Sequence, residues 1–189
     1  DLVKDIQVLV PMYRGENGIN NINNALQEKF NPLKDEEIKS HNHSFRIGDK
    51  VLQLVNRSEK DIMNGDIGKV YRFEKSDGEI TGLEVEFDSG IVKYKLEELD
   101  DLTLAYAITI HKAQGSEFDL VVMPITSQYY IMLRKKLIYT GITRTKKYLV
   151  MLGSVNYLAM GITKMDDQRQ TKLKERLEDK REVTPFDFM

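Results

Sequence analysis

The N-terminal part of the sequence places a short apolar run before a segment of helical periodicity. The β-branched run 6–10, closed by Pro11, predicts a buried strand. Apolar residues at helical spacing then predict an amphipathic helix over about 18–30, which Asn31-Pro32 ends. The polar segment 34–43 is typical of a linker. The chain therefore opens with a strand and a helix of one layered domain.

The C-terminal part again combines short apolar runs with segments of helical periodicity. The alanines of Ala105–Ala113 favour a helix, with a strand as the alternative. Apolar runs predict strands at 120–124 and 148–152, helical spacing predicts a helix within 130–147, and 156–162 predicts a short helix. Strands that alternate with helices indicate a parallel sheet with right-handed crossovers.

The middle of the chain has a different pattern, with short strand-like runs separated by turn signals such as Asp77-Gly78. We expect strands at 50–55, 68–73, 83–87 and 91–96. Between 83 and 87 apolar and acidic residues alternate, so one face of that strand is buried. Several short strands in a small segment predict an SH3-like barrel.

The predicted fold class is thus α/β, a RecA-like parallel sheet interrupted by a small all-β SH3-like barrel. We divide the chain into a discontinuous α/β domain of residues 1–43 and 103–165, a barrel insert of residues 44–102, and a charged helix or tail of residues 166–189.

Composition narrows the chemistry of this domain. The 189 residues include 28 Lys and Arg, 30 Asp and Glu, three His and no Cys, which excludes disulfides, Cys-based zinc sites and thiol catalysis. The net charge of −2 argues against a protein that simply coats nucleic acid, although a local basic patch remains compatible with it. The composition without Cys suits the cytosol, so we expect a cytoplasmic protein. No apolar run reaches membrane-spanning length.

The first candidate site is the loop that follows the first strand. It carries Arg14 and Gly15 and leads into the predicted helix. Backbone N–H groups at a helix N-terminus attract phosphate, and an adjacent arginine adds a bidentate clamp. The alternative is a tight turn with a solvated arginine.

The second candidate is the segment 109–119, which concentrates groups able to bind phosphate, base or ribose. Its candidate residues are Thr109, His111, Lys112, Gln114, Gly115 and Glu117. The basic side chains can donate to phosphates, a carboxylate can accept from sugar hydroxyls, and the glycine permits a close backbone approach. The alternative is a capped helix end with a surface histidine.

The third candidate is Arg144, which lies among small hydroxyl residues before a predicted strand. Six basic residues fall between 134 and 147 without an acidic one. An arginine in this setting is suited to the γ-phosphate of a nucleotide. The alternative, a solvated basic face, explains the lysines better than it explains Arg144.

The sequence lacks a phosphate-binding P-loop, because Gly65-Asp66-Ile67-Gly68-Lys69-Val70 is too short and has no hydroxyl residue. It also has no Asp-Glu pair placed after a strand to hold magnesium. His41 and His43 have no Cys or clear carboxylate partner and are interpreted as linker residues. The chain can therefore complete a phosphate site but cannot cradle the phosphates.

These segments together resemble the RecD-like helicases of superfamily 1. Residues 8–27 resemble their motif IV, 105–118 their motif V and 139–146 their motif VI, and the insert is similar to the SH3-like domain between motifs IV and V. The resemblance covers residues 1–155. It implies the second RecA-like domain of a 5′-to-3′ DNA helicase of the exodeoxyribonuclease V alpha chain family, active in DNA repair and recombination.

The resemblance also implies roles for the candidate residues. Arg14 and Arg144 would contact the γ-phosphate of ATP, and Gly15, with the motif V residues Gln114, Gly115 and Glu117, would lie on the nucleotide side. Thr109, His111 and Lys112 would contact or couple to single-stranded DNA.

The first motor domain, with its Walker motifs and bound Mg²⁺, is absent, so we expect no ATPase activity from this chain alone. The expected partners are that N-terminal motor domain, single-stranded DNA and other repair proteins.

Three alternatives remain open at the level of sequence. The first is that the chain is a non-catalytic nucleic-acid or protein binding module with a helicase-like fold. The second is that it acts on RNA, since motifs IV to VI do not distinguish RNA from DNA. The third concerns the insert, which binds either DNA or a partner protein. Its acidic second half disfavours binding to the phosphates of DNA, whereas the basic residues of its first half leave one basic face available.

Overall fold

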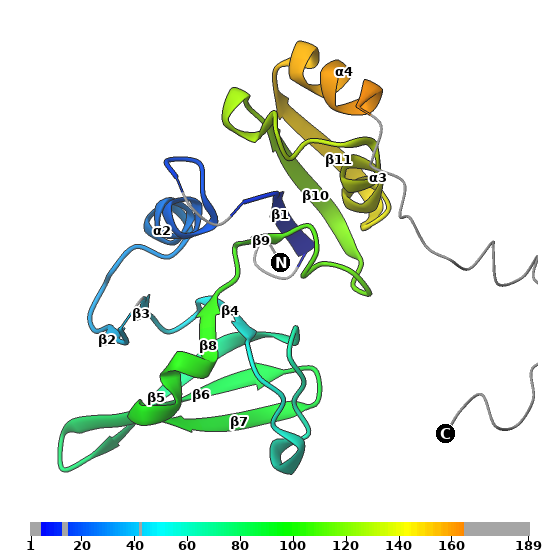
Figure 1. The fold of residues 1–189 in the computed structure, drawn as a ribbon. Helices are drawn as coiled ribbons and strands as arrows, with labels where there is room; N and C mark the ends of the chain where they lie inside the picture. Colours follow the sequence, from blue (N-terminus) through cyan, green and yellow to red (C-terminus); the bar gives the residue numbers. More distant parts are fainter. Residues whose placement is uncertain (1–4, 13–14, 42, 165–189) are drawn as a thin grey trace, which may run out of the picture.

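The computed structural model describes residues 5–12, 15–41 and 43–164 and consists of a parallel α/β unit and an antiparallel β unit (Figure 1). The predicted tail 166–189 and the side chain of Arg14 lie outside the described residues.

The parallel sheet has the strand order β11-β10-β1-β9. Its strands are β1 (Ile6–Val10), β9 (Ala107–Thr109), β10 (Phe118–Ile125) and β11 (Thr145–Gly153). The predicted strands at 6–10, 120–124 and 148–152 are confirmed. Each contains a β-branched or apolar run of the kind that is typical of parallel strands.

Three α-helices accompany this sheet: α2 (Ile19–Phe30), α3 (Lys135–Ile142) and α4 (Val155–Thr163). The helix α2 ends where Asn31 precedes Pro32, as the pattern predicts. Helix α3 approaches the sheet closely at Gly141, where an added Cβ would lie 2.7 Å from the methyl carbon of Met123. A side chain at position 141 would therefore require the Met123 side chain to move.

Two expectations for the C-terminal part differ from the structure in type or in extent. Ala105–Ala113 contains the short strand β9 instead of a helix, because Ala107 completes the sheet beside Val8 and exchanges backbone hydrogen bonds with the Asn23 side chain. The helix predicted within 130–147 is confined to α3, since residues 145–147 already pair with β10. Burial in the sheet overrides the helix propensity of alanine.

The middle of the chain forms an antiparallel sheet in the order β7-β6-β5-β4-β8. Its strands are β4 (Lys50–Gln53), β5 (Ile67–Ser76), β6 (Glu79–Phe87), β7 (Gly90–Lys95) and β8 (Leu102–Leu104). The four expected strands are confirmed, and β8 adds a fifth that pairs with β4.

Short elements complete the middle of the chain. The expected linker 34–43 contributes to a small hairpin, β2 (Ile38–Lys39) with β3 (Ser44–Phe45). Three 3-10 turns, η1 (Ser58–Lys60), η2 (Leu96–Asp101) and η3 (Ser127–Tyr129), complete the element order.

A buried carboxylate joins the two units. Asp49 is fully buried and accepts hydrogen bonds from the Gln27 amide at 2.6 Å, the Asn31 amide at 2.7 Å and the Tyr106 hydroxyl at 2.8 Å. Its remaining partner is the Arg46 backbone N–H at 2.7 Å. Burial raises the pKa of Asp49, while these donors favour its ionised form. The helix α2 and the antiparallel unit are thereby held together by one acceptor.

Candidate functional site

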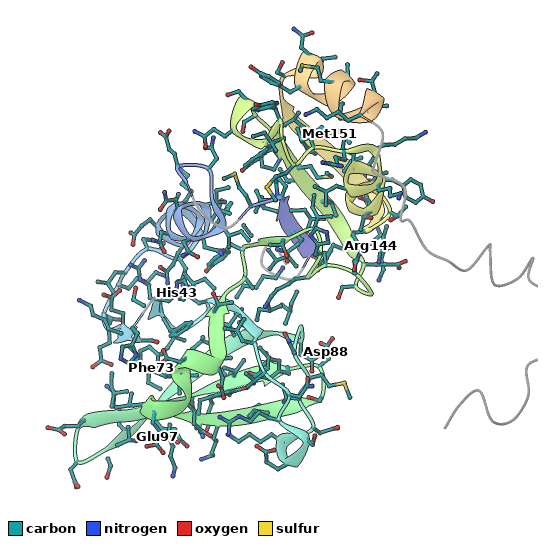
Figure 2. The ribbon with its side chains drawn as sticks, in the orientation of Figure 1. His43, Phe73, Asp88, Glu97, Arg144 and Met151 are labelled. Atoms are coloured by element: carbon teal, nitrogen blue, oxygen red, sulfur yellow. The ribbon has the colours of Figure 1, made fainter. Side chains whose placement is uncertain are left out.

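Arg144 lies at the amino end of β11, directly after α3 (Figure 2). Its guanidinium donates from Nη1 to the Ser116 carbonyl at 3.2 Å and from Nε to the Thr140 carbonyl at 3.3 Å. The Arg144 carbonyl in turn accepts the Phe118 N–H at 2.8 Å. The half-buried arginine is therefore fixed to the segment that enters β10.

That segment is a series of tight turns between β9 and β10. The Ala113 N–H donates to the Thr109 carbonyl at 3.1 Å, and the Lys112 N–H donates to the Thr109 hydroxyl at 3.0 Å. Gly115 has φ +91°, a conformation that favours glycine. Gln114, Gly115 and Glu117 are exposed, so their polar groups are available to a ligand.

The structure separates the candidate residues between two edges of the parallel sheet. Phe118 pairs with Thr145 at the amino edge, beside Arg144. Gly15 follows the carboxyl end of β1, close to the Gln128 side chain. Because Val8 is level with Val122, the end of β1 lies six residues along β10 from Phe118, or roughly 20 Å.

This separation divides the predicted nucleotide-binding residues. Arg144, Gly115 and Glu117 come together at the amino edge, whereas Gly15 is at the opposite edge and does not join them. The Arg14 side chain lies outside the described residues, so its contact with the same phosphate stays a prediction.

The predicted DNA-facing residues Thr109 and Lys112 line a cavity of about 290 Å³ between α2, the antiparallel unit and β9. Asn20 and His43 line the same cavity. Desolvation lowers the pKa of Lys112, and it also lowers that of His43. His111 is exposed and does not line the cavity. The cavity therefore combines polar and cationic groups with apolar walls.

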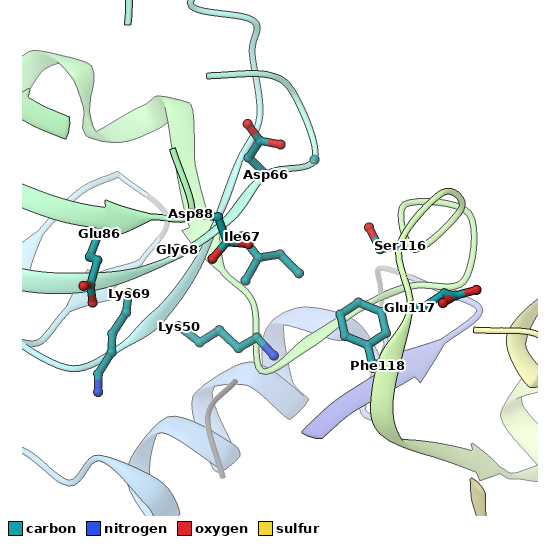
Figure 3. A pocket seen from close by; sticks show the side chains of 11 residues that line it. Lys50, Asp66, Ile67, Gly68, Lys69, Glu86, Asp88, Ser116, Glu117 and Phe118 are labelled. Carbon is teal, nitrogen blue, oxygen red and sulfur yellow. The ribbon is translucent and has the colours of Figure 1, made fainter. Parts of the chain in front are cut away.

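A second cavity of about 310 Å³ lies between the antiparallel unit and the entry to β10 (Figure 3). Ser116, Glu117 and Phe118 line it from one side, and Lys50 and Asp66 line it from the other. Of these residues the sequence identified Glu117, but it gave no signal for Lys50, which looks like an ordinary residue of a barrel strand.

Lys50 is 2% exposed, and its ammonium donates to the Ile6 carbonyl at 3.0 Å. It also lies 5.6 Å from the centre of the Phe118 ring. Desolvation lowers the pKa of Lys50 to about 8. The antiparallel unit thus places a buried cation against the strand that begins beside Arg144.

The histidines of the hairpin segment have structural partners. His41 and Ser40 both contact the Asp100 carboxylate, at 3.0 Å and 2.6 Å, and His43 contacts the Thr103 hydroxyl at 3.0 Å. Within residues 5–12, 15–41 and 43–164, no group of three or more His, Asp or Glu side chains is placed to hold a metal ion. In the same ranges, no helix is both long and apolar enough to cross a membrane.

Two family models match the chain. The model of the UvrD-like helicase C-terminal domain matches residues 104–152, and that of the ATP-dependent RecD-like DNA helicase SH3 domain matches residues 22–87. The second match includes most of α2, the helix that Asp49 joins to the antiparallel unit. The division of the chain into domains at 43/44 and 102/103 stays a prediction.

Curated relatives extend over most of the chain. The ATP-dependent RecD2 DNA helicase of Deinococcus radiodurans is 34% identical over 172 residues, which are 91% of this chain and 23% of that protein. The RecBCD enzyme subunit RecD of Buchnera aphidicola subsp. Schizaphis graminum is 31% identical over 148 residues, or 77% of this chain and 24% of that protein. The chain spans about a quarter of the length of these relatives.

Solved structures support the fold. The chain aligns with Bacteroides Pif1 bound to single-stranded DNA with a TM-score of 0.58 at 20% identity, covering 85% of this chain and 43% of that one. Bacteroides Pif1 in complex with ADP-AlF3 and single-stranded DNA gives a TM-score of 0.57 at 19% identity, covering 92% and 44%. The alignments therefore show that this chain shares the fold of these Pif1 structures.

Proposed function

Because this chain belongs to the RecD-like helicases and corresponds to their C-terminal motor region, we propose that it forms one half of an ATP-driven 5′-to-3′ DNA motor. The other half is the N-terminal motor domain of the same polypeptide, which holds the phosphates of ATP. The observation that carries the proposal is the attachment of Arg144 to the segment that ends in the exposed Glu117.

We assign the amino edge of the sheet to the nucleotide. Arg144 supplies a positive charge to the γ-phosphate when the two motor domains close. Gln114, Gly115 and Glu117 lie in the segment attached to it, where a carboxylate can accept from ribose hydroxyls. The γ-phosphate then favours the closed arrangement, and hydrolysis removes that attraction.

We assign the carboxyl edge to single-stranded DNA. Thr109 and Lys112 contribute polar and cationic groups to a cavity there, and His111 lies between them in the sequence. The position of Gly15 at this edge favours a place for its loop beside the DNA and not beside the nucleotide. Arg14 keeps the γ-phosphate role that the family resemblance implies as an untested prediction.

We further propose that the isolated chain does not hydrolyse ATP. Its sequence contains no P-loop and no Asp-Glu pair placed after a strand to hold Mg²⁺. We therefore assign the metal ion and the phosphate cradle to the N-terminal domain.

An ATPase assay tests this proposal. The 189-residue chain and the full polypeptide are compared with and without single-stranded DNA. We expect no turnover from the chain and DNA-stimulated turnover from the full polypeptide. A full polypeptide that binds DNA but never hydrolyses ATP would instead support a non-catalytic binding module, and stimulation by RNA alone would reassign the substrate.

A further inference from the structure

The guanidinium of Arg144 has a third acceptor besides the two carbonyls described above. Its Nη2 atom donates to the Thr143 hydroxyl at 3.2 Å. The Nη1 atom is bonded to the Ser116 carbonyl and the Nε atom to the Thr140 carbonyl. Every nitrogen of the guanidinium therefore has an acceptor within this domain.

The acceptors of Arg144 are all uncharged, since two are backbone carbonyls and one is a hydroxyl. In the part of the chain that the structure describes, no Asp or Glu side chain forms an ion pair with Arg144. A carboxylate in place of the hydroxyl would orient the guanidinium equally well, but it would compete with a phosphate for the positive charge. The arginine is thus oriented without being neutralised.

The same contacts leave part of the guanidinium available. An arginine side chain has five N–H groups in a planar fork. The three contacts use one N–H on each nitrogen, which leaves one on Nη1 and one on Nη2 without an acceptor among the described residues. Arginine N–H groups in this planar fork can bind a phosphate in a bidentate manner. The domain therefore fixes the plane of the fork and leaves two donors for an anion.

The Thr143 hydroxyl is itself held in place. It donates to the Thr140 carbonyl at 3.0 Å, a local bond from side chain to backbone that threonine commonly makes. A hydroxyl has one donor and two acceptor positions, so it can serve this bond and the Arg144 N–H at the same time. The branched side chain of threonine also has few rotamers. The hydroxyl is therefore a rigid acceptor.

The backbone around Thr143 is fixed as well. The Thr143 N–H donates to the Tyr139 carbonyl at 3.0 Å, and the Arg144 N–H donates to the Gly141 carbonyl at 3.2 Å. At Gly141 the helix α3 lies close to Met123 of β10. The hydroxyl is thus attached to the end of a helix that rests on the sheet, and its position is set by the fold.

We propose that Thr143 is a positioning residue for Arg144, whose hydroxyl holds the guanidinium in the plane in which its remaining N–H groups meet the γ-phosphate. This inference rests on the proposed function of Arg144 and adds a second residue to it. A preoriented arginine loses less side-chain freedom when the motor domains close, so more of its attraction to the phosphate stabilises the transition state. Of the three acceptors, only the hydroxyl can be removed by substitution.

Steady-state ATP hydrolysis by the full polypeptide, stimulated by single-stranded DNA, tests the inference. Thr143→Val removes the hydroxyl and keeps the branched shape, Thr143→Ala removes it without a branched side chain, and Thr143→Ser retains it. Thr143→Val is also combined with Arg144→Ala. Thermal unfolding and single-strand affinity of each full polypeptide monitor its fold.

The matched control is Thr163→Val. The hydroxyl of Thr163, at the exposed end of α4, donates to the Met160 carbonyl at 3.0 Å, so it makes the same kind of local bond as Thr143. Thr163 has no contact with Arg144. The control therefore separates the loss of a threonine bond at a helix end from the loss of the contact with the arginine.

We expect Thr143→Val and Thr143→Ala to lower kcat roughly tenfold with little change in the KM for ATP, because the arginine acts in the transition state. Thr143→Ser and Thr163→Val should stay within about twofold of the native kcat. In the Arg144→Ala background, Thr143→Val should cause no further loss, since the hydroxyl acts only through the guanidinium.

An equal loss from Thr143→Val in the native and Arg144→Ala backgrounds would show a merely structural role and overturn the inference. Near-native kcat values for folded Thr143→Val and Thr143→Ala, beside a strongly impaired Arg144→Ala, would also overturn it but would leave the proposed function of Arg144 intact. A near-native rate for Arg144→Ala would contradict the proposed function, and this inference with it.

Discussion

The Arg144 guanidinium and the Ser116 carbonyl are joined by a 3.2 Å hydrogen bond that links the end of α3 to the loop before β10. The two residues are 28 positions apart in the sequence. A displacement of that loop by a bound nucleotide therefore reaches the arginine directly. This contact joins Arg144 to the loop before β10 and supports the proposal that Arg144 contacts the γ-phosphate.

The buried carboxylate of Asp49 is expected to be a major determinant of stability. The substitution Asp49→Ala leaves buried donors from Gln27, Asn31 and Tyr106 without their shared acceptor. Each loss of a hydrogen bond to a charged group costs about 1.5–3 kcal/mol, so we expect a loss of about 3 kcal/mol or more in the free energy of unfolding. Urea denaturation of the 189-residue chain measures it.

The exposed residue Asp88 provides the control for this experiment. The substitution Asp88→Ala is expected to change the free energy of unfolding by no more than about 0.5 kcal/mol. Equal effects of the two substitutions would show that Asp49 does not hold the units together.

Lys50 predicts an unusual dependence of stability on pH. Its pKa is about 8 in the folded chain and 10.5 ordinarily, so between these values the unfolded state binds more protons. The free energy of unfolding therefore rises with pH above 8, by about 2 kcal/mol up to pH 9.5 from this group.

The substitution Lys50→Met removes that contribution, and the exposed Lys34→Met is the control. Comparison with the variants cancels the contributions of other groups, such as Lys112. Urea midpoints measured at pH 7 and pH 9.5 report the effect. Parallel pH profiles for the native chain and Lys50→Met would contradict the burial of a neutral amine.

Lys112 is expected to contribute one phosphate contact to DNA binding. In the full polypeptide, Lys112→Ala should reduce the slope of log affinity against log salt by about 0.7, the value for one contact to a single strand. The effect should be independent of DNA sequence. Fluorescence anisotropy between 50 and 200 mM salt, with Lys34→Ala as control, measures it; an unchanged slope would remove Lys112 from the DNA track.

Much of the fold can be predicted from local sequence patterns, because buried parallel strands are continuous apolar runs, whereas the short antiparallel strands alternate apolar and polar residues. The strand at Ile6–Val10 and the helix at Ile19–Phe30 are examples. The strand at Ala107–Thr109 is only the less favoured alternative in the sequence, since its alanines favour a helix and its state is decided by Val8 and Asn23, far away in the sequence.

The candidate site shows the same limit. Motif resemblance located Arg144 and the segment Thr109–Glu117, but spacing alone does not say to which edge of a sheet a loop belongs. Gly15 was grouped with the nucleotide residues, and the register of β1 against β10 places it at the other edge. Lys50 was missed because its burial depends on packing between two units.

The central claim is that this chain supplies Arg144 to a nucleotide whose phosphates are held by another domain. The most direct test is DNA-stimulated ATP hydrolysis by the full polypeptide carrying Arg144→Ala or Arg144→Lys. Thermal unfolding of the corresponding 189-residue variants controls for the lost contact with Ser116. The affinity of each variant for single-stranded DNA shows whether the carboxyl edge of the sheet, the proposed DNA-binding side, is unchanged.

We predict that Arg144→Ala lowers kcat by roughly 10³-fold or more, as loss of an arginine finger does, while single-strand affinity is retained. The lysine variant should restore only part of the rate, because it lacks the planar fork. Near-normal DNA-stimulated hydrolysis by a folded Arg144→Ala polypeptide would contradict the account.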